Sequence, residues 1–237
     1  MENATIQYRF TLADGSQMVY DLELDGQNFE LVGNIPKTLP SWTNLDFHEC
    51  PHCPLPIDTH PHCPLAVRLV SIVEPFDRLL SYDKIRVDVV TEERSISQDT
   101  TAEQGISSLM GLVIAASGCP HTAFFKPMGR FHLPLASEPE TTYRAASMYL
   151  LAQYFLKKEG QDADLELKGL KKIYDNIQIV NASTAKRLRA ATEKDSSLNA
   201  IVMLDMFAKS ISYAIEESLE QIRHLFSPFF IKNTETR

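Results

Sequence analysis

The sequence predicts an α+β protein whose N-terminal antiparallel β meander, Cys/His-rich middle region and C-terminal antiparallel helical bundle follow one another. Two observations support this class. Alternating apolar and polar residues fill the N-terminal segment, whereas apolar residues at helical spacing fill the C-terminal one. We expect residues 1–134 to form a β-rich region that holds a Cys-Pro cluster, and residues 135–237 to form a helical region packed with it as one unit.

The N-terminal segment has the pattern of a β meander. Three runs of strand-like residues follow one another, at 6–12, 18–24 and 29–32. Asp14-Gly15 separates the first two runs, and Asp25-Gly26 separates the second from the third. Asp-Gly between alternating runs is a strong signal for a tight hairpin turn.

The middle region, from about residue 33 to 134, is rich in proline and contains all four cysteines and six of the seven histidines. It has one convincing strand, at 84–91. A short buried helix is expected at 64–73, and a second helix at 101–116 is closed by Gly118, a residue that suits the end of a helix.

Three helices are expected in the C-terminal region. Ser137 and Glu140 form a capping box that starts the first, which runs to 159 and stops at Gly160. The second spans about 164–194, with a break at 181–183 as an alternative, and the third spans about 196–226 and is ended by Ser227-Pro228. Short connections favour antiparallel packing, and the polar tail 232–237 is expected to fray.

Composition excludes several classes of partner. The 237 residues carry a net charge of −8 with scattered basic residues, so the chain lacks the basic face that binds nucleic acid. It begins without a basic, apolar signal, and its apolar runs are far shorter than the roughly 20 residues that span a bilayer. We therefore expect a cytoplasmic protein that binds no membrane, where cysteines stay reduced and serve as ligands or nucleophiles.

Each of the four cysteines is followed by proline. The pairs are Cys50-Pro51, Cys53-Pro54, Cys63-Pro64 and Cys119-Pro120. At the proline frequency of this chain, four such coincidences have a probability of about 10⁻⁵ from composition alone. Proline suits the first position of a helix, which predicts Cys63 and Cys119 as N-caps whose sulfurs face free backbone N–H groups. That position favours the thiolate, the form that binds metal and attacks electrophiles.

These cysteines predict a metal site. Cys50 and Cys53 form a C-x-x-C pair, and with Cys63 and Cys119 they make a Cys₄ set that suits zinc first, with an iron–sulfur cluster as the alternative. Pro54 stands where a zinc knuckle has glycine, so an ordinary knuckle is excluded. Nearby histidines are alternative ligands, namely His48, His52, His60, His62 and His121. A third interpretation is buried, inert cysteines in proline-stiffened turns.

A metal- or thiol-dependent enzyme is the alternative function, with Cys119 acting beside His121 or His132. His132, Glu140 and Arg144 then line a polar pocket near Cys119. A capping network with a surface ion pair between Glu140 and Arg144 is the favoured interpretation of those residues. The long C-terminal helices further suggest a homodimer.

Five motifs resemble those of an uncharacterised bacterial protein family: C-P-H-C-P-L, H-C-P-L-A, S-G-C-P, R-F-H-L-P and E-T-T-Y-R. The resemblance covers the chain from Trp42 to about Asn199. It implies one unit with a Cys-Pro cluster, and it implies no substrate or reaction.

Overall fold

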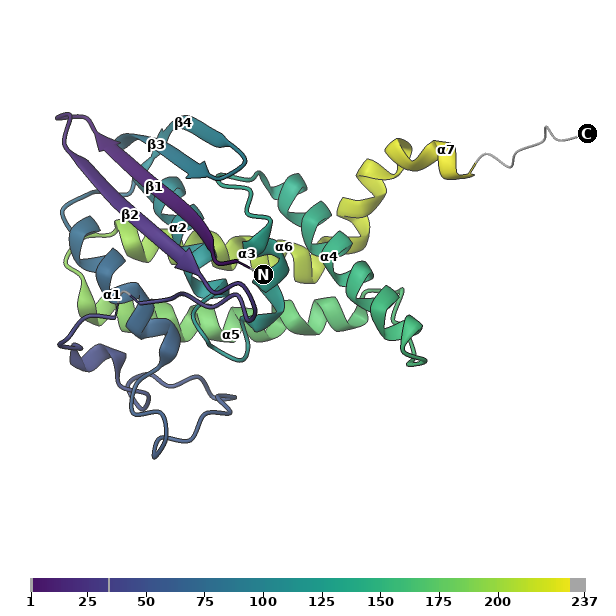
Figure 1. Ribbon diagram of the computed structural model, residues 1–237, viewed down its shortest axis with the longest axis horizontal. Helices are drawn as coiled ribbons and strands as arrows, with labels where there is room; N and C mark the ends of the chain where they lie inside the picture. The colour runs from purple at the N-terminus through teal and green to yellow at the C-terminus, as the bar shows by residue number, and fades with distance from the viewer. Residues whose placement is uncertain (1, 34, 231–237) are drawn as a thin grey trace, which may run out of the picture.

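The computed structural model describes residues 2–33 and 35–230, which form a four-stranded antiparallel sheet with helices against one of its faces (Figure 1). The predicted α+β class is confirmed. The strand order is β2-β1-β3-β4. The strands are β1 Ala4–Leu12, β2 Gln17–Leu24, β3 Lys84–Thr91 and β4 Ser95–Thr101.

The two faces of the sheet differ because apolar and polar residues alternate along its strands. Tyr8 and Phe10 of β1 and Val87 of β3 point into the core and are fully buried. On the opposite face, Gln7 donates a hydrogen bond to Asp21 across the β1–β2 pair. The core therefore lies on one side of the sheet only, where the helices pack.

Two strand predictions need correction. The run 29–32 is not a strand: it makes a single bridge, between Leu31 and Leu24, and then the backbone N–H of Leu31 bonds to the carbonyl of Ala116 at 3.0 Å. The third strand of the sheet is instead β3, which pairs with β1 and not with β2. The sequence also gave no sign of β4, because only Thr100 in this edge strand is buried and apolar alternation is missing.

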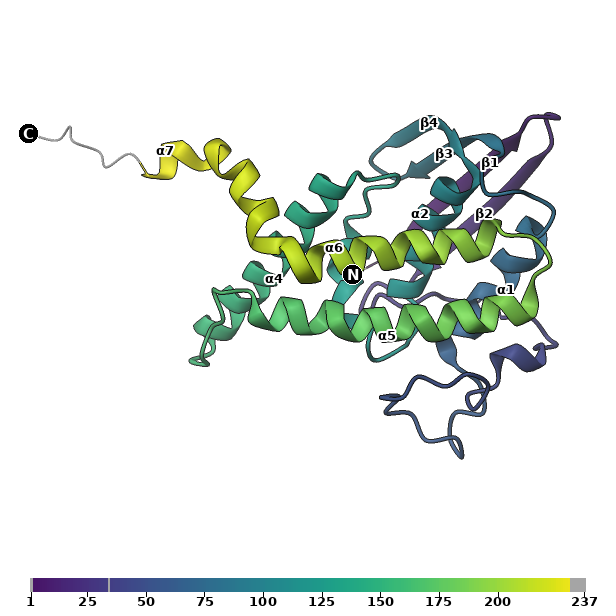
Figure 2. The same ribbon diagram turned by 180° about the vertical axis from the view of Figure 1, so that it is seen from behind.

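The α-helices of the described residues are α1 Pro64–Phe76, α2 Ala102–Ala115, α3 Lys126–Arg130, α4 Glu138–Lys158, α5 Lys168–Ala191, α6 Ser196–Ile222 and α7 Ser227–Phe230. α1 and α2 lie next to the sheet, and α5 and α6 run side by side as a hairpin on their far side (Figure 2). The capping box at Ser137 and Glu140 starts α4 as predicted.

Packing between α2 and the sheet is closest at Gly105. A Cβ added there would lie 2.8 Å from Cγ2 of Val87 and 2.9 Å from Cδ1 of Ile85. These distances are shorter than real van der Waals contacts, so only glycine fits without a shift. The same core continues through α2 to Leu188 of α5 and Ile201 of α6, which places helices from both halves of the chain around one interior.

Several helix boundaries differ from the predictions. α5 continues through 181–183 without a break, because Asn181 and Ser183 are buried within the packed helix. α6 ends at Ile222, and Pro228 lies inside the short helix α7 instead of ending a longer one. The predicted fraying of 232–237 concerns residues outside those described.

Within the described part of the chain, no helix taken singly has the length and apolar composition needed to cross a bilayer. The segments Ser196–Tyr213 and Glu217–Phe230, bent by 85° relative to each other, meet the length and composition test only as a pair.

Candidate functional site

All four cysteines line one small cavity, although they come from two separate parts of the chain. Cys50 and Cys53 lie in the segment before α1, Cys63 precedes α1, and Cys119 follows α2. The cavity has a volume of about 20 Å³. A space of roughly 10–15 Å³ admits one water molecule, so this cavity accommodates one water-sized particle. The predicted convergence of the cysteines is thus present in the structure as a shared cavity.

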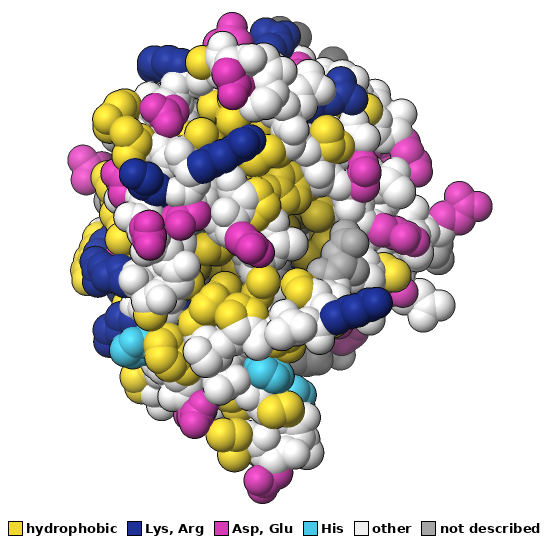
Figure 3. Space-filling model, turned by 90° about the vertical axis from the view of Figure 1, so that its left-hand side faces the viewer, with side chains coloured by type: hydrophobic (Ala, Val, Ile, Leu, Met, Phe, Trp, Pro, Cys, Tyr) yellow, Lys and Arg dark blue, Asp and Glu magenta, His cyan; other side chains and the backbone are white. Residues whose placement is uncertain are grey.

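Short backbone hydrogen bonds hold the cysteine segment in place. The N–H of Cys53 donates to the carbonyl of Cys50 at 2.9 Å, which closes a tight turn over the C-x-x-C pair. The N–H of Cys63 donates to the carbonyl of Thr43 at 2.8 Å and anchors the end of the segment. In Figure 3, histidine and apolar side chains gather at the lower end of the molecule, where this segment projects from the helices.

Only one of the two predicted N-caps is found. Cys63 is the N-cap of α1 with Pro64 in the first turn, and its side chain makes no capping hydrogen bond. Cys119 begins a turn and not a helix, because the N–H of Thr122 bonds to its carbonyl at 3.1 Å. Its sulfur accepts hydrogen bonds from the N–H groups of His121 and Thr122, which favours negative charge on sulfur as a helix start would.

Burial dominates the ionisation of these thiols. It raises the pKa of Cys119 to about 11, and the neighbouring sulfurs of Cys63 and Cys50 add to the increase. Burial also raises the pKa of Cys50, against the opposing effects of a hydrogen bond from Ser183 and the charge of Arg187. Both groups are therefore thiols at neutral pH, and a bound cation must displace their protons.

Arg187 of α5 supplies a buried positive charge at this cavity, which it also lines. The residue is 3% exposed, and its guanidinium donates to the carbonyls of Trp42, Asn44 and Leu45 at 2.8, 2.7 and 2.9 Å. None of these acceptors is charged. Arg187 was not singled out from the sequence, although its spacing of seven from the buried Val180 puts it on the apolar face of the helix.

The candidate histidines are placed unequally around the cavity. His121 lines it, and its ring stacks on that of His52 with centroids 3.9 Å apart. Nε2 of His121 donates to the carbonyl of His52 at 2.9 Å, and Nε2 of His52 donates to the carbonyl of Asn176 at 3.2 Å. Nδ1 of His52 is buried without a hydrogen-bond partner among the described residues.

The other candidates make separate contacts. Nδ1 of His62 lies 2.9 Å from Oγ1 of Thr43, Nδ1 of His60 lies 2.9 Å from Oγ1 of Thr59, and His48 packs against Phe47. Across residues 2–33 and 35–230, no three His, Cys, Asp or Glu side chains are placed so that they could hold a metal ion. The shared cavity is therefore not a formed ligand set.

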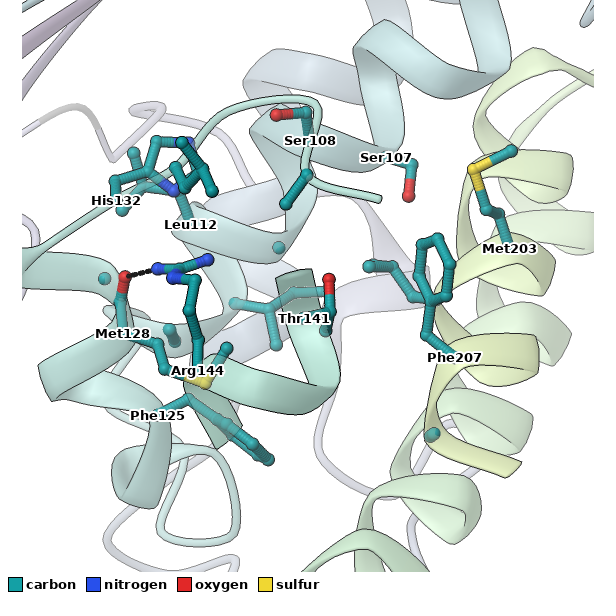
Figure 4. A pocket seen from close by; sticks show the side chains of 18 of the residues that line it. Ser107, Ser108, Leu112, Phe125, Met128, His132, Thr141, Arg144, Met203 and Phe207 are labelled. Carbon is teal, nitrogen blue, oxygen red and sulfur yellow. Dashed lines mark hydrogen bonds between the residues drawn. The ribbon is translucent and has the colours of Figure 1, made fainter. Parts of the chain in front are cut away.

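A second, much larger cavity of about 440 Å³ lies between α2, α4, α5 and α6. Figure 4 shows its mixed lining, in which Phe125, Met203 and Phe207 face the same space as Ser107 and Arg144. Its volume is within the range of small-molecule sites, which are roughly 300–1,000 Å³.

His132 forms one polar edge of this pocket. Its Nε2 is 2.5 Å from the hydroxyl of Tyr8, which in turn is 2.8 Å from Oγ of Ser108. Burial and the nearby charge of Arg144 lower the pKa of His132 to about 3. The imidazole is therefore neutral at physiological pH, and hydrogen bonds connect it through Tyr8 to Ser108.

The predicted ion pair between Glu140 and Arg144 is wrong. The Glu140 carboxylate instead accepts from the backbone N–H and the hydroxyl of Ser137, both at 2.8 Å. Nη2 of Arg144 donates to the carbonyls of Met128 and Phe131 at 2.7 and 2.9 Å. Of the three residues expected in a polar pocket, His132 and Arg144 line it and Glu140 does not; the pocket is mainly apolar, and Cys119 lines the other cavity.

The end of α6 and the segment after it expose large apolar side chains, among them Tyr213, Leu225 and Phe229. The predicted homodimer through the C-terminal helices stays a prediction, which light scattering on the purified protein tests.

Comparison with known proteins gives one match. A family model described as Domain of unknown function (DUF6901) matches residues 6–227. No curated protein and no solved structure matches the chain.

Proposed function

The chain belongs to the family of the Domain of unknown function (DUF6901), and we propose that it is a metal-binding protein in which Cys50, Cys53, Cys63 and Cys119 hold one zinc ion. The observation that carries the proposal is that four thiols from two separate parts of the chain line one cavity. Tetrahedral coordination by four cysteines is a common form of structural zinc site.

The size of the cavity favours a single ion over a cluster. Its volume of about 20 Å³ suits one water-sized particle, whereas an iron–sulfur cluster contains several atoms besides the cysteine ligands. Binding requires the thiols to turn toward a common centre, because their present placement does not form a ligand set. Cys63 is suited to this movement, since its side chain makes no capping hydrogen bond.

The charges around the cavity also suit an anionic centre. Four thiolates around Zn²⁺ carry a net charge of −2, which is costly to bury without compensation. Arg187 supplies a buried positive charge beside the thiols, and two backbone N–H groups point at the sulfur of Cys119. Hydrogen bonds from backbone N–H groups to ligating sulfurs stabilise their negative charge.

A thiol-dependent enzyme is supported less well. A nucleophilic cysteine needs a lowered pKa, and burial instead raises the pKa of Cys119 to about 11. His121 lines the same cavity but donates its Nε2–H to a backbone carbonyl.

The test is elemental analysis and a visible spectrum of the freshly purified full chain, with single Cys→Ser variants at each of the four positions. We expect one zinc per chain, no colour, and a lower zinc content together with a lower melting temperature in each variant. His121→Gln reports whether a cavity histidine replaces a cysteine ligand, and His60→Gln, which changes an exposed residue outside the cavity, is the matched control.

Unchanged metal content in all four cysteine variants would contradict the proposal. Iron with sulfide and a brown colour would mean that the same cysteines hold an iron–sulfur cluster and not zinc. A wild-type protein that neither carries zinc nor takes it up after reduction would leave the cysteines as inert core residues.

A further inference from the structure

We infer that the large pocket between α2, α4, α5 and α6 binds a small molecule with an apolar body and a single carboxylate, whose head group pairs with Arg144. This site is separate from the cysteine cavity and does not depend on metal binding. The inference combines the volume of the pocket, its apolar lining and an arginine that forms no ion pair with a described Asp or Glu.

The volume and lining define the body of the ligand. The pocket of about 440 Å³ is bounded by Phe125, Met128, Met203 and Phe207, which are large and apolar. Leu112 and Leu204 add to the same lining. Burial of apolar surface against such walls is the main source of affinity, at roughly 25 cal/mol for each Å² removed from water.

The charge of Arg144 defines the head group. Burial lowers the pKa of this guanidinium, which means that its positive charge is poorly solvated. Only Nη2 is hydrogen-bonded, to the carbonyls of Met128 and Phe131. The N–H groups of Nε and Nη1 have no acceptor among the described residues, and no described Asp or Glu forms an ion pair with this side chain.

A carboxylate matches these free donors better than other anions. It is planar and accepts two parallel hydrogen bonds from a guanidinium fork. It also carries one negative charge, which neutralises one arginine, whereas a phosphate monoester at neutral pH would bury additional uncompensated charge. Neutral His132 next to Arg144 adds no second positive charge.

Asn181 gives an independent indication that the pocket lacks a polar partner. This residue of α5 is 4% exposed and lines the pocket, and its Nδ2 has no hydrogen-bond acceptor in the described chain. A buried donor without an acceptor costs free energy. Asn181 is thus a second donor on the pocket wall that a ligand oxygen could satisfy, independent of Arg144.

The test is calorimetric titration of the full-length protein with decanoate, and with 1-decanol as a neutral molecule of the same chain length. We expect decanoate to bind at least tenfold more tightly than 1-decanol. Arg144→Met is expected to lose that preference, by roughly tenfold to a hundredfold, the range of one to two charge-assisted hydrogen bonds. Arg130→Met, which removes an exposed arginine of α3, is the matched control and keeps the preference.

Two further variants keep the test decisive. Ser107→Leu fills part of the pocket and is expected to weaken decanoate and 1-decanol together. Arg144→Lys keeps the positive charge but lacks the guanidinium fork, so we expect an intermediate preference for decanoate over 1-decanol. This variant replaces Arg144→Met in the test if Arg144→Met does not fold. Equal binding of both compounds by the wild type, no binding of either, or an unchanged preference in the folded Arg144 variants would overturn the inference. Zinc content is expected to be unchanged in all of them, so this result and the metal proposal fail separately.

Discussion

The cysteine cavity and the apolar pocket are both lined by α5 and by the turn after α2, but they differ in almost every physical property. The first is about 20 Å³, and the second is about 440 Å³. One face of α5 contributes Val180 and Arg187 to the first cavity and Ile177 and Asn181 to the second. In the turn after α2, Cys119 belongs to the small cavity and Thr122 to the large one.

The arginine of each cavity, buried Arg187 and half-buried Arg144, shows what the difference means. Arg187 bonds with both Nη atoms to three backbone carbonyls and holds the cysteine segment against α5. Arg144 bonds with one Nη atom only and keeps the rest of its fork free toward the pocket. The same side chain thus acts as a structural clamp in one place and as an unfilled recognition group in the other.

The largest expected effect is on the clamp. Arg187→Met leaves three carbonyls without their donors, and a buried unsatisfied polar group costs about 1–3 kcal/mol, so we expect a loss of roughly 3 kcal/mol or more in the free energy of unfolding. Urea denaturation of the metal-free protein measures it. Arg189→Met, which changes an exposed arginine on the same helix, is the control and should lie close to the wild type. Equal stabilities of the two variants would mean that Arg187 does not hold the segment.

The second prediction compares the two faces of α2, one against the sheet and one against the pocket. Gly105→Ala places a methyl group 2.8 Å from Val87, and such overpacking costs roughly 1–3 kcal/mol. Gly111 lines the pocket, and a Cβ there would meet its nearest atom, Cδ2 of Leu204, at 3.6 Å. Gly111→Ala should therefore stabilise the helix, by about 1 kcal/mol from propensity alone.

Thermal or urea unfolding of both variants decides this comparison. Similar losses of stability at the two positions would show that the pocket side of α2 is as tightly packed as the sheet side. That result would mean that the pocket lacks the free space that ligand binding requires.

The sequence predicted features that depend on local chemistry. Asp14-Gly15 set the first hairpin, and the capping box at Ser137 set the start of α4. Cys63-Pro64 predicted a helix that starts at Pro64 with Cys63 as its N-cap, and α1 begins there. These signals are readable because the residues that cause the structure lie close together in the chain.

Features that depend on distant contacts were missed. β4 has no apolar alternation and forms because β3 offers it an edge, with Val89 opposite Ile96. The pocket is lined by residues of five helices, α2 to α6, and each apolar residue alone has the pattern of ordinary core. Arg187 did carry a signal, a charge on an apolar helix face, but its carbonyl partners lie some 140 positions away in the sequence, at separations of 142 to 145.

The third prediction concerns pH on the pocket side. The pKa of His132 is lowered from 6.5 to about 3 in the folded chain. Between these values the unfolded chain binds more protons, so stability is complete above pH 6.5 and declines as the pH falls toward 3. One pH unit below the ordinary value, at about pH 5.5, the expected loss from this residue is about 1.4 kcal/mol.

His132→Gln keeps an acceptor for Tyr8 and removes the titration. Its free energy of unfolding should change less between pH 7.5 and 5.5 than that of the wild type, by about 1.4 kcal/mol. His224→Gln, at an exposed position, is expected to keep the wild-type dependence. An identical dependence in His132→Gln would show that His132 is not held neutral by the pocket.

The same measurement joins the two arguments about the pocket. The positive charge of Arg144 is the second cause of the low pKa of His132, after burial. A carboxylate paired with Arg144 offsets that charge, so saturating decanoate should raise the pKa of His132 and reduce the loss of stability at pH 5.5. 1-Decanol fills the pocket without a charge and should leave the pH dependence as it is. If decanoate reduces the loss of stability at pH 5.5 and 1-decanol does not, the carboxylate lies next to Arg144. Binding affinities by themselves do not locate the carboxylate.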